Sequence, residues 1–141
     1  MKEYICSLEQ LDELAGTFSS KLKKGSVVLL HGELGSGKTT FVKFLIGHLG
    51  GNWDDVTSPT FNLVHQYKTA RFDVWHFDLY RLKSKEELYN LGVDDALENG
   101  ISILEWGEIA ESLLQPIHTK IFFEYAGDPK VRKVLVENMH C

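Results

Sequence analysis

Apolar residues in the first third of the chain occur in two patterns, at helical spacing and in continuous runs. A short strand over residues 2–6 comes first. It is followed by apolar residues at helical spacing, namely Leu8, Leu11, Leu14, Ala15, Phe18 and Leu22. Ser7 followed by Gln10 forms the sequence signature of a capping box, so this helix is expected to begin directly after Ser7. Residues 26–31 then form a continuous apolar run, which is typical of a strand buried in a parallel sheet.

A glycine-rich turn follows that strand and leads into a second helix, predicted over residues 38–49 and stopped by Gly50-Gly51. Residues 61–68 and 71–80 are strand-like and are separated by two residues, so a hairpin is expected after this helix. Ser84, three residues before Glu87, predicts the start of a short helix that runs through residue 91.

The last third of the chain returns to strands. Residues 101–104 form another apolar strand, a helix is expected over 107–114, and residues 117–125 and 131–137 are expected to form a closing hairpin. Helices that alternate with strands early in the chain, followed by hairpins, predict an α/β fold with a mixed central sheet flanked by helices. A length of 141 residues suits one domain over residues 1–141.

Composition narrows the class of protein. Fifteen basic and 20 acidic residues give a net charge of −5, which argues against a stand-alone nucleic-acid binder with a basic surface. Residues 1–10 lack the apolar segment of a targeting signal, and the longest aliphatic run, residues 27–30, is far shorter than a membrane span. We therefore expect a cytoplasmic protein with no membrane association, in which Cys6 and Cys141 are free thiols.

The strongest chemical signal is a complete G-x-x-x-x-G-K-[ST] motif between the buried strand and the second helix. It reads Gly32-Glu33-Leu34-Gly35-Ser36-Gly37-Lys38-Thr39. Its glycines allow the backbone amides to surround phosphate oxygens, and the helix that follows directs its positive end at the same anion. Lys38 would reach the β- and γ-phosphates, while the Thr39 hydroxyl would bind Mg²⁺. The motif predicts a P-loop NTPase-like domain.

A P-loop enzyme also needs acidic groups that hold the metal and orient the attacking water. Two apolar strands end in such a group, one at Asp78 and one at Glu105. The latter has the form of a Walker B strand with Glu in place of Asp. A solvated carboxylate at a strand end is the alternative for each, and the sequence does not rank the two residues.

Two further features bear on the nucleotide. Ser58-Pro59-Thr60 lies in a loop after the P-loop helix, where a threonine either senses the γ-phosphate or simply starts a strand behind a proline turn. The guanine-reading N-K-x-D pattern and the D-x-x-G switch pattern are both missing, which favours ATP. The six histidines lack metal-ligand spacing, so no zinc site is expected.

Five sequence blocks occur in a recognisable order. They are residues 32–41 (GELGSGKTTF), 58–61 (SPTF), 76–81 (HFDLYR), 86–92 (EELYNLG) and 105–106 (EW). In these blocks the chain resembles the TsaE (YjeE) family, the P-loop ATPases of bacterial tRNA threonylcarbamoyladenosine biosynthesis, over residues 7 to 136. It departs from the family pattern at Gly107, where Pro usually follows E-W, and at Leu11, where the first helix often carries Thr.

The resemblance implies a role for each candidate residue. Lys38, Asp78 and Glu105 would be catalytic. Thr39 and Glu105 would hold Mg²⁺ directly or through water, and Asp78 would order the metal's water shell or the hydrolytic water. The residues implied to contact ATP are Glu33, Leu34, Gly35, Ser36, Gly37, Lys38, Thr39, Thr40, Thr60 and Trp106.

Members of this family are similar in acting with a TsaD–TsaB heterodimer, and the resemblance implies that tRNA is contacted mainly through those partners. We expect the isolated chain to be a monomer or to associate weakly. Only Arg71, Arg81 and Arg132 are available as arginines, so weak ATPase activity is expected without partners. A small-molecule kinase and a nucleotide-gated binding module without a need for catalysis are the alternatives.

Overall fold

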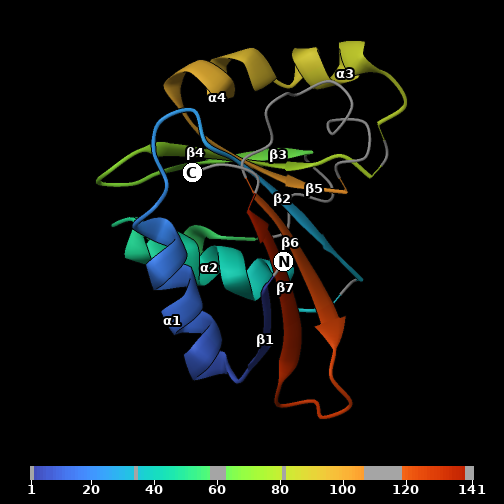
Figure 1. Ribbon diagram of the computed structural model, residues 1–141. Coiled ribbons are helices and arrows are strands. Elements are labelled where there is room, and N and C mark those ends of the chain that lie inside the picture. Colours follow the sequence, from blue (N-terminus) through green and yellow to red (C-terminus); the bar gives the residue numbers. More distant parts are fainter. Residues whose placement is uncertain (1, 34, 58–62, 81, 107–118, 139–141) are drawn as a thin grey trace.

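The computed structural model describes residues 2–33, 35–57, 63–80, 82–106 and 119–138 (Figure 1). The helices and strands follow in chain order as β1 (Lys2–Cys6), α1 (Leu8–Ser19), β2 (Val27–Gly32), α2 (Lys38–His48), the 3₁₀ helix η1 (Trp53–Asp55), β3 (Val64–Lys68), β4 (Asp73–Asp78), α3 (Lys85–Asn90), α4 (Val93–Asn99), β5 (Gly100–Glu105), β6 (Thr119–Tyr125) and β7 (Arg132–Asn138).

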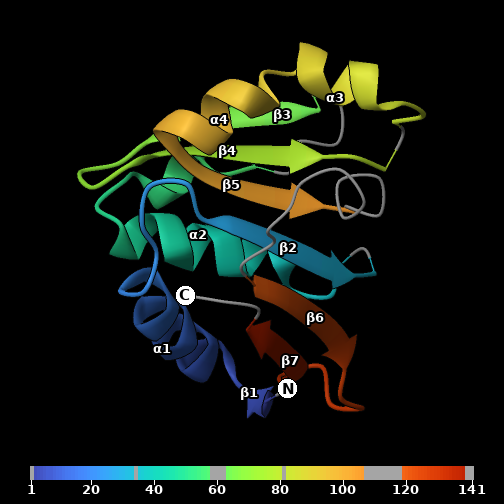
Figure 2. The same ribbon diagram turned by 45° about the horizontal axis from the view of Figure 1, so that its top comes forward.

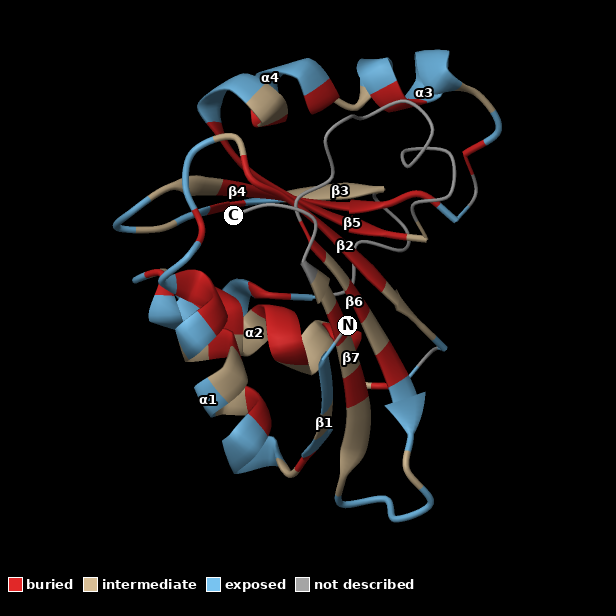
Figure 3. Cartoon of the chain, viewed as in Figure 1, coloured by how far each residue is buried: buried red, intermediate tan, exposed pale blue. Residues whose placement is uncertain are grey.

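The strands form one mixed sheet in the order β1-β7-β6-β2-β5-β4-β3. The central strands β6, β2, β5 and β4 run parallel, and antiparallel strands complete both edges. Every residue of β5 is buried, as is most of β2 (Figure 3). Continuous apolar runs suit this central position because both faces of these strands are covered by helices. The predicted mixed sheet is confirmed.

Helices cover the two faces of the sheet (Figures 1 and 2). Helices α1 and α2 pack on the face formed by Val28, Leu30 and alternate residues of the neighbouring strands. Helices α3 and α4 pack on the opposite face, which includes Val27 and Leu29. Successive residues of β2 thus face different helical layers, as the pleat of a strand requires.

Helix α1 begins with the predicted capping box, in which the Ser7 and Gln10 side chains each bond the other residue's backbone amide. Its end differs from the prediction, because regular helix stops at Ser19 rather than at Leu22. The amide of Leu22 instead donates to the Ser19 carbonyl at 3.2 Å, a tighter turn that still buries the Leu22 side chain. The Arg71 guanidinium donates to the Ser19 carbonyl at 2.9 Å and to the Leu22 carbonyl at 3.4 Å. Local turn bonds and one tertiary contact thus satisfy the carbonyls that the end of this helix leaves without a helical partner.

Both predicted hairpins are present, as β3–β4 and as β6–β7. Strand β4 is shorter than predicted, Asp73–Asp78 instead of 71–80, whereas β7 has the predicted length and is displaced by one residue. The Ser84 hydroxyl accepts a hydrogen bond from the Glu87 amide at 3.4 Å, and α3 begins there as expected. The predicted helix over residues 107–114 lies outside the described residues. Within the part of the chain that the structure describes, no helix is long and apolar enough to cross a membrane.

Candidate functional site

The turn between β2 and α2 is folded tightly against strand β6. Gly32, Gly35 and Gly37 have φ angles of 154°, 79° and 115°, so the turn uses backbone conformations that favour glycine. A Cβ added to Gly32 would lie 2.5 Å from the Ser36 Oγ and 2.8 Å from the Phe123 carbonyl oxygen. The close approach arises because Gly32 and Phe123 are register partners on adjacent parallel strands.

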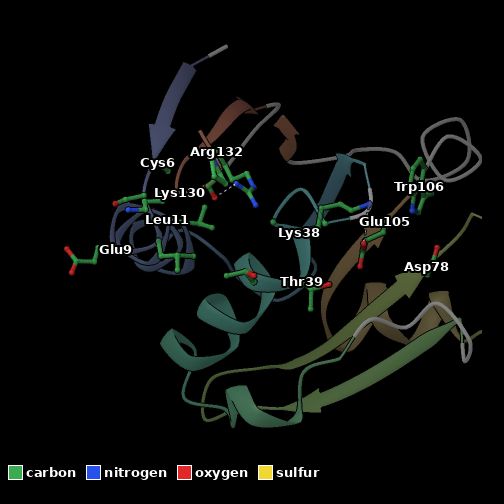
Figure 4. Close-up of a pocket in the computed structure, with 16 residues that line it drawn as sticks. Cys6, Glu9, Leu11, Lys38, Thr39, Asp78, Glu105, Trp106, Lys130 and Arg132 are labelled. Atoms are coloured by element: carbon green, nitrogen blue, oxygen red, sulfur yellow. Dashed lines mark hydrogen bonds and ion pairs between the residues drawn. The ribbon is translucent and has the colours of Figure 1, made fainter. Parts of the chain in front are cut away.

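A cavity of about 680 Å³ opens beside this turn (Figure 4). Arg132, Lys130 and Leu11 lie at one end of it, Asp78, Glu105 and Trp106 lie at the other, and Lys38 and Thr39 lie between them. Five separate segments build its wall: the start of α1, the P-loop with the first turn of α2, the ends of β4 and β5, and the β6–β7 turn. The lining includes both charged and apolar side chains, so the cavity suits a ligand with a phosphate part and an apolar part.

Lys38 is buried in this cavity, with only 5% of its surface exposed. Its Nζ donates a hydrogen bond to the Gly32 carbonyl at 2.6 Å and lies 3.5 Å from Glu105 Oε1. The ammonium also stands 4.3 Å from the centroid of the Trp106 ring, within the range of a cation–π contact. Lys38 therefore has three partners inside the protein, and its charge is compensated by one of them.

Glu105 ends β5 and receives contacts from two basic side chains. Its Oε1 faces Lys38, and its Oε2 accepts a hydrogen bond from His76 Nε2. Burial by itself raises the pKa of the Glu105 carboxyl, but the hydrogen bond and charge interaction with His76, together with those of Lys38, outweigh burial and bring the pKa below its usual value. The Glu105 side chain is therefore an ionised carboxylate at neutral pH.

Asp78 is the register partner of Glu105 across the parallel pair β4–β5. Its Oδ1 accepts a hydrogen bond from the Tyr80 amide at 3.1 Å, which orients the carboxylate while only 5% of the residue is exposed. Trp106 follows Glu105 with a left-handed φ of 57°, and its ring meets the Tyr80 ring edge-on with centroids 5.2 Å apart. The ends of two adjacent strands thus place two carboxylates and an indole ring at one end of the cavity.

The residues present fit an anion together with a divalent cation. The Ser36 Oγ is buried and has no hydrogen-bond partner, and the left-handed glycines shape the turn around it. The described residues contain no group of three or more His, Cys, Asp or Glu side chains arranged to hold a metal. A cation here would therefore take oxygens from a bound phosphate in addition to Thr39 and Glu105.

Most of the residues singled out in the sequence line this one cavity: Gly35, Gly37, Lys38, Thr39, Thr40, Asp78, Glu105 and Trp106. Ser36 is buried within the loop, whereas Glu33 is exposed and lines a separate depression with residues of β6. Leu34, Thr60 and Arg81 lie outside the described residues.

Sequence reasoning missed the opposite end of the cavity. Cys6, Leu11, Lys130 and Arg132 line it, although they come from the two ends of the chain. Antiparallel pairing of β1 with β7 brings them together, since Cys6 is the register partner of Arg132. The sequence marks Leu11 as an apolar position of a helix and as a departure from a family pattern, and nothing in the local sequence around residues 130–132 marks a ligand site.

His76 was also overlooked as a site residue. It belongs to the HFDLYR block, but its spacing from Glu105 in the chain carries no signal of contact. The two side chains meet because β4 and β5 are adjacent and because His76 and Glu105 point to the same face of the sheet.

Known proteins are similar to this chain in sequence and in fold. The model of the family described as "Threonylcarbamoyl adenosine biosynthesis protein TsaE" matches residues 5–134. The tRNA threonylcarbamoyladenosine biosynthesis protein TsaE of Rickettsia bellii is 45% identical over 88% of this chain and 86% of its own, and that of Haemophilus influenzae is 37% identical over 77% and 68%. The crystal structure of Bacillus subtilis YdiB superposes with a TM-score of 0.68 at 26% identity, covering 94% of this chain and 83% of that chain. With a P-loop beside two carboxylates in a mixed α/β fold, and with a match over nearly its whole length, the chain belongs to the TsaE family.

Proposed function

We propose that this protein binds and hydrolyses ATP with Mg²⁺ in the biosynthesis of threonylcarbamoyladenosine in tRNA, in concert with a TsaD–TsaB heterodimer. The observation that carries the proposal is the placement of Lys38 and Glu105 3.5 Å apart at a P-loop cavity large enough for a nucleotide. The family to which the chain belongs supports the pathway.

The P-loop would hold the phosphates of ATP through its backbone amides and through the amino end of α2. Lys38 would exchange the Gly32 carbonyl and the Glu105 carboxylate for phosphate oxygens, which as charged acceptors bind an ammonium more strongly than a neutral carbonyl does. Thr39 and Glu105 would hold Mg²⁺, which when bound neutralises charge that develops on the phosphate oxygens.

Hydrolysis then requires a water placed in line with the bond from the γ-phosphorus to its bridging oxygen. A new bond forms between the water oxygen and the phosphorus, the bridging bond breaks, and ADP and phosphate leave with the released proton. Asp78 is suited to orient this water because it lines the cavity and the Tyr80 amide holds its Oδ1 in place.

The supply of arginine supports dependence on partners. Arg71 lies far from the P-loop in the sequence and does not line the cavity. Its guanidinium donates hydrogen bonds to the carbonyls of Ser19 and Leu22. Arg132 lies at the end of the cavity opposite Glu105. Phosphoryl transfer gains much of its rate from an added cation at the γ-phosphate. Of the two arginines in the described residues, neither lies at the Glu105 end of the cavity, which is consistent with the weak hydrolysis that we expect from the isolated chain.

The test is steady-state phosphate release by the isolated protein and by the protein mixed with TsaD–TsaB, combined with an assay of tRNA modification. We expect partners to raise turnover and Glu105→Ala to abolish it. Glu98→Ala, which removes an exposed acid on α4, serves as the matched control. Equal turnover with and without partners would remove the partner-dependent part of the proposal.

The same materials separate the alternatives. ATP-dependent phosphorylation of a metabolite would favour a kinase. Normal tRNA modification by a Glu105→Ala protein that still binds its partners would favour a nucleotide-gated binding module.

A further inference from the structure

His76 is a buried polar residue with an unusual position beside the proposed ATP site. It lies in the middle of β4, two residues before Asp78, and none of its surface is exposed. Its Nε2 is hydrogen-bonded to Glu105 Oε2, and its ring packs at 6.4 Å from the ring of Tyr67 on the edge strand β3. Its Nδ1 has no hydrogen-bond partner among the described residues.

We propose that His76 is a positioning residue that holds Glu105 Oε2 inside the sheet, so that Oε1 alone is presented to the cavity. This inference rests on the proposed function, because it concerns how Glu105 meets Mg²⁺ and the nucleotide. His76 itself does not line the cavity and is not assigned a catalytic role.

The two partners of Glu105 differ in their freedom to move. Lys38 is at the first position of α2 and has a long side chain that can turn from Glu105 Oε1 toward phosphate oxygens. His76 has a short side chain that is fully buried, so it cannot follow. When Lys38 leaves, Oε1 becomes available to a cation while the bond from His76 keeps the carboxylate in its orientation.

The cost of burying this histidine supports a role beyond packing. An imidazole with one unpartnered nitrogen is less favourable in this position than an aliphatic side chain of similar size. Neighbouring positions on the same face of the sheet, such as Val74 and Ile103, are aliphatic. The bond to Glu105 is the polar contact that a histidine makes here and a leucine would not. Partners of this kind orient metal-binding carboxylates in many proteins.

Three substitutions separate hydrogen bonding from packing. His76→Leu fills the space without a donor. His76→Gln retains an amide donor near the position of Nε2, whereas the shorter side chain of His76→Asn does not reach it. Val74→Ala, on the same face of β4, is the matched control for a general weakening of the core.

The measurement is nucleotide affinity with Mg²⁺ and with EDTA, from which the gain in affinity due to Mg²⁺ is obtained for each variant. Loss of a residue that orients a metal ligand typically costs 10–100-fold, so we expect that gain to fall about tenfold or more in the Leu and Asn variants and to remain within about threefold of wild type in the Gln variant. Affinity in EDTA should be alike in all variants, and Val74→Ala should keep the wild-type gain from Mg²⁺.

A second readout needs no nucleotide. In ¹⁵N-labelled ligand-free protein, we expect the His76 side-chain NMR signal to show a proton on Nε2 that exchanges slowly with water and that moves in a Glu105→Ala variant. A proton on Nδ1 with a bare Nε2 would overturn the proposal.

An unchanged gain from Mg²⁺ in His76→Leu, or equal losses in the Gln and Leu variants, would also overturn it. Wild-type protein that fails to bind Mg–ATP would instead refute the proposed function, and the inference would fail with it. The two failures are therefore distinguishable by the wild-type measurement.

Discussion

Replacing Gly32 by alanine tests whether the P-loop owes its shape to close packing against strand β6. The added Cβ would lie 2.8 Å from the Phe123 carbonyl oxygen, which belongs to the backbone of a central strand and cannot move aside freely. It would also lie 2.5 Å from the Ser36 Oγ inside the loop. The loop, and not the strand, is expected to shift.

Two effects contribute to the loss of stability. Overpacking a well-packed region costs about 1–3 kcal/mol. Placing an L-residue in a positive-φ conformation costs a further 1–2 kcal/mol, roughly. Gly92→Ala gives the cost of an alanine at a positive φ without a steric clash, because Gly92 has a φ of 90° and nothing lies within 4 Å of its added Cβ. For a chain of this length each kcal/mol lowers Tm by about 3–4 °C. We expect Gly32→Ala to melt about 3–12 °C below Gly92→Ala.

The functional consequence is measured by ATP affinity. A shift of the loop that removes one charge-assisted hydrogen bond to phosphate, worth about 1.5–3 kcal/mol, weakens binding tenfold or more in Gly32→Ala. Gly92→Ala, on the far helical layer at the start of α4, should bind ATP as the wild type does. The reasoning is refuted if the two variants melt together, or if Gly32→Ala binds ATP as tightly as Gly92→Ala does.

Three further predictions concern individual side chains. Glu105 has a lowered pKa in the folded protein, so its contribution to stability is present above the usual value of 4.5 and is lost as the pH falls through the lower folded value. In thermal melts from pH 7 to 3, the Tm of Glu105→Gln should therefore fall less steeply than that of the wild type. Parallel curves would contradict this. ATP binding should change tryptophan emission because Lys38 leaves the Trp106 ring, and Trp106→Phe should abolish this change. A change that persists in Trp106→Phe would have to come from another tryptophan and would contradict the prediction. Arg71→Lys should lower the unfolding free energy by about 1 kcal/mol in urea titrations, since a lysine cannot hold both carbonyls at the end of α1, and an altered ATP affinity in this variant would argue against a purely structural role.

Features that depend on neighbours in the chain were predictable from the sequence. The capping box at Ser7, the glycine-rich turn before Lys38 and the strand that ends at Glu105 each have a local pattern, and the structure has the corresponding helix start, turn and strand end. The net charge and the scarcity of arginine also follow directly from the sequence. Both hairpins followed from strand-like runs separated by a few turn residues.

Helix ends and strand lengths were less predictable. Apolar spacing continued to Leu22, but α1 ends at Ser19, whose carbonyl accepts hydrogen bonds from the Leu22 amide and from Arg71, a residue that lies about fifty positions later in the chain. A spacing pattern reports which side chains are buried, and it does not report which backbone groups find a partner elsewhere.

The composition of the site was decided by strand order. The sequence by itself determined a P-loop and two candidate carboxylates, because each of them is marked by its immediate neighbours in the chain. Only the tertiary structure decided that Asp78 and Glu105 are register partners, that His76 holds Glu105, and that β1 and β7 carry Cys6 and Arg132 to the other end of the cavity. The physical reason is that these contacts join distant segments, whose pairing depends on which strands lie side by side in a sheet that the whole chain must form.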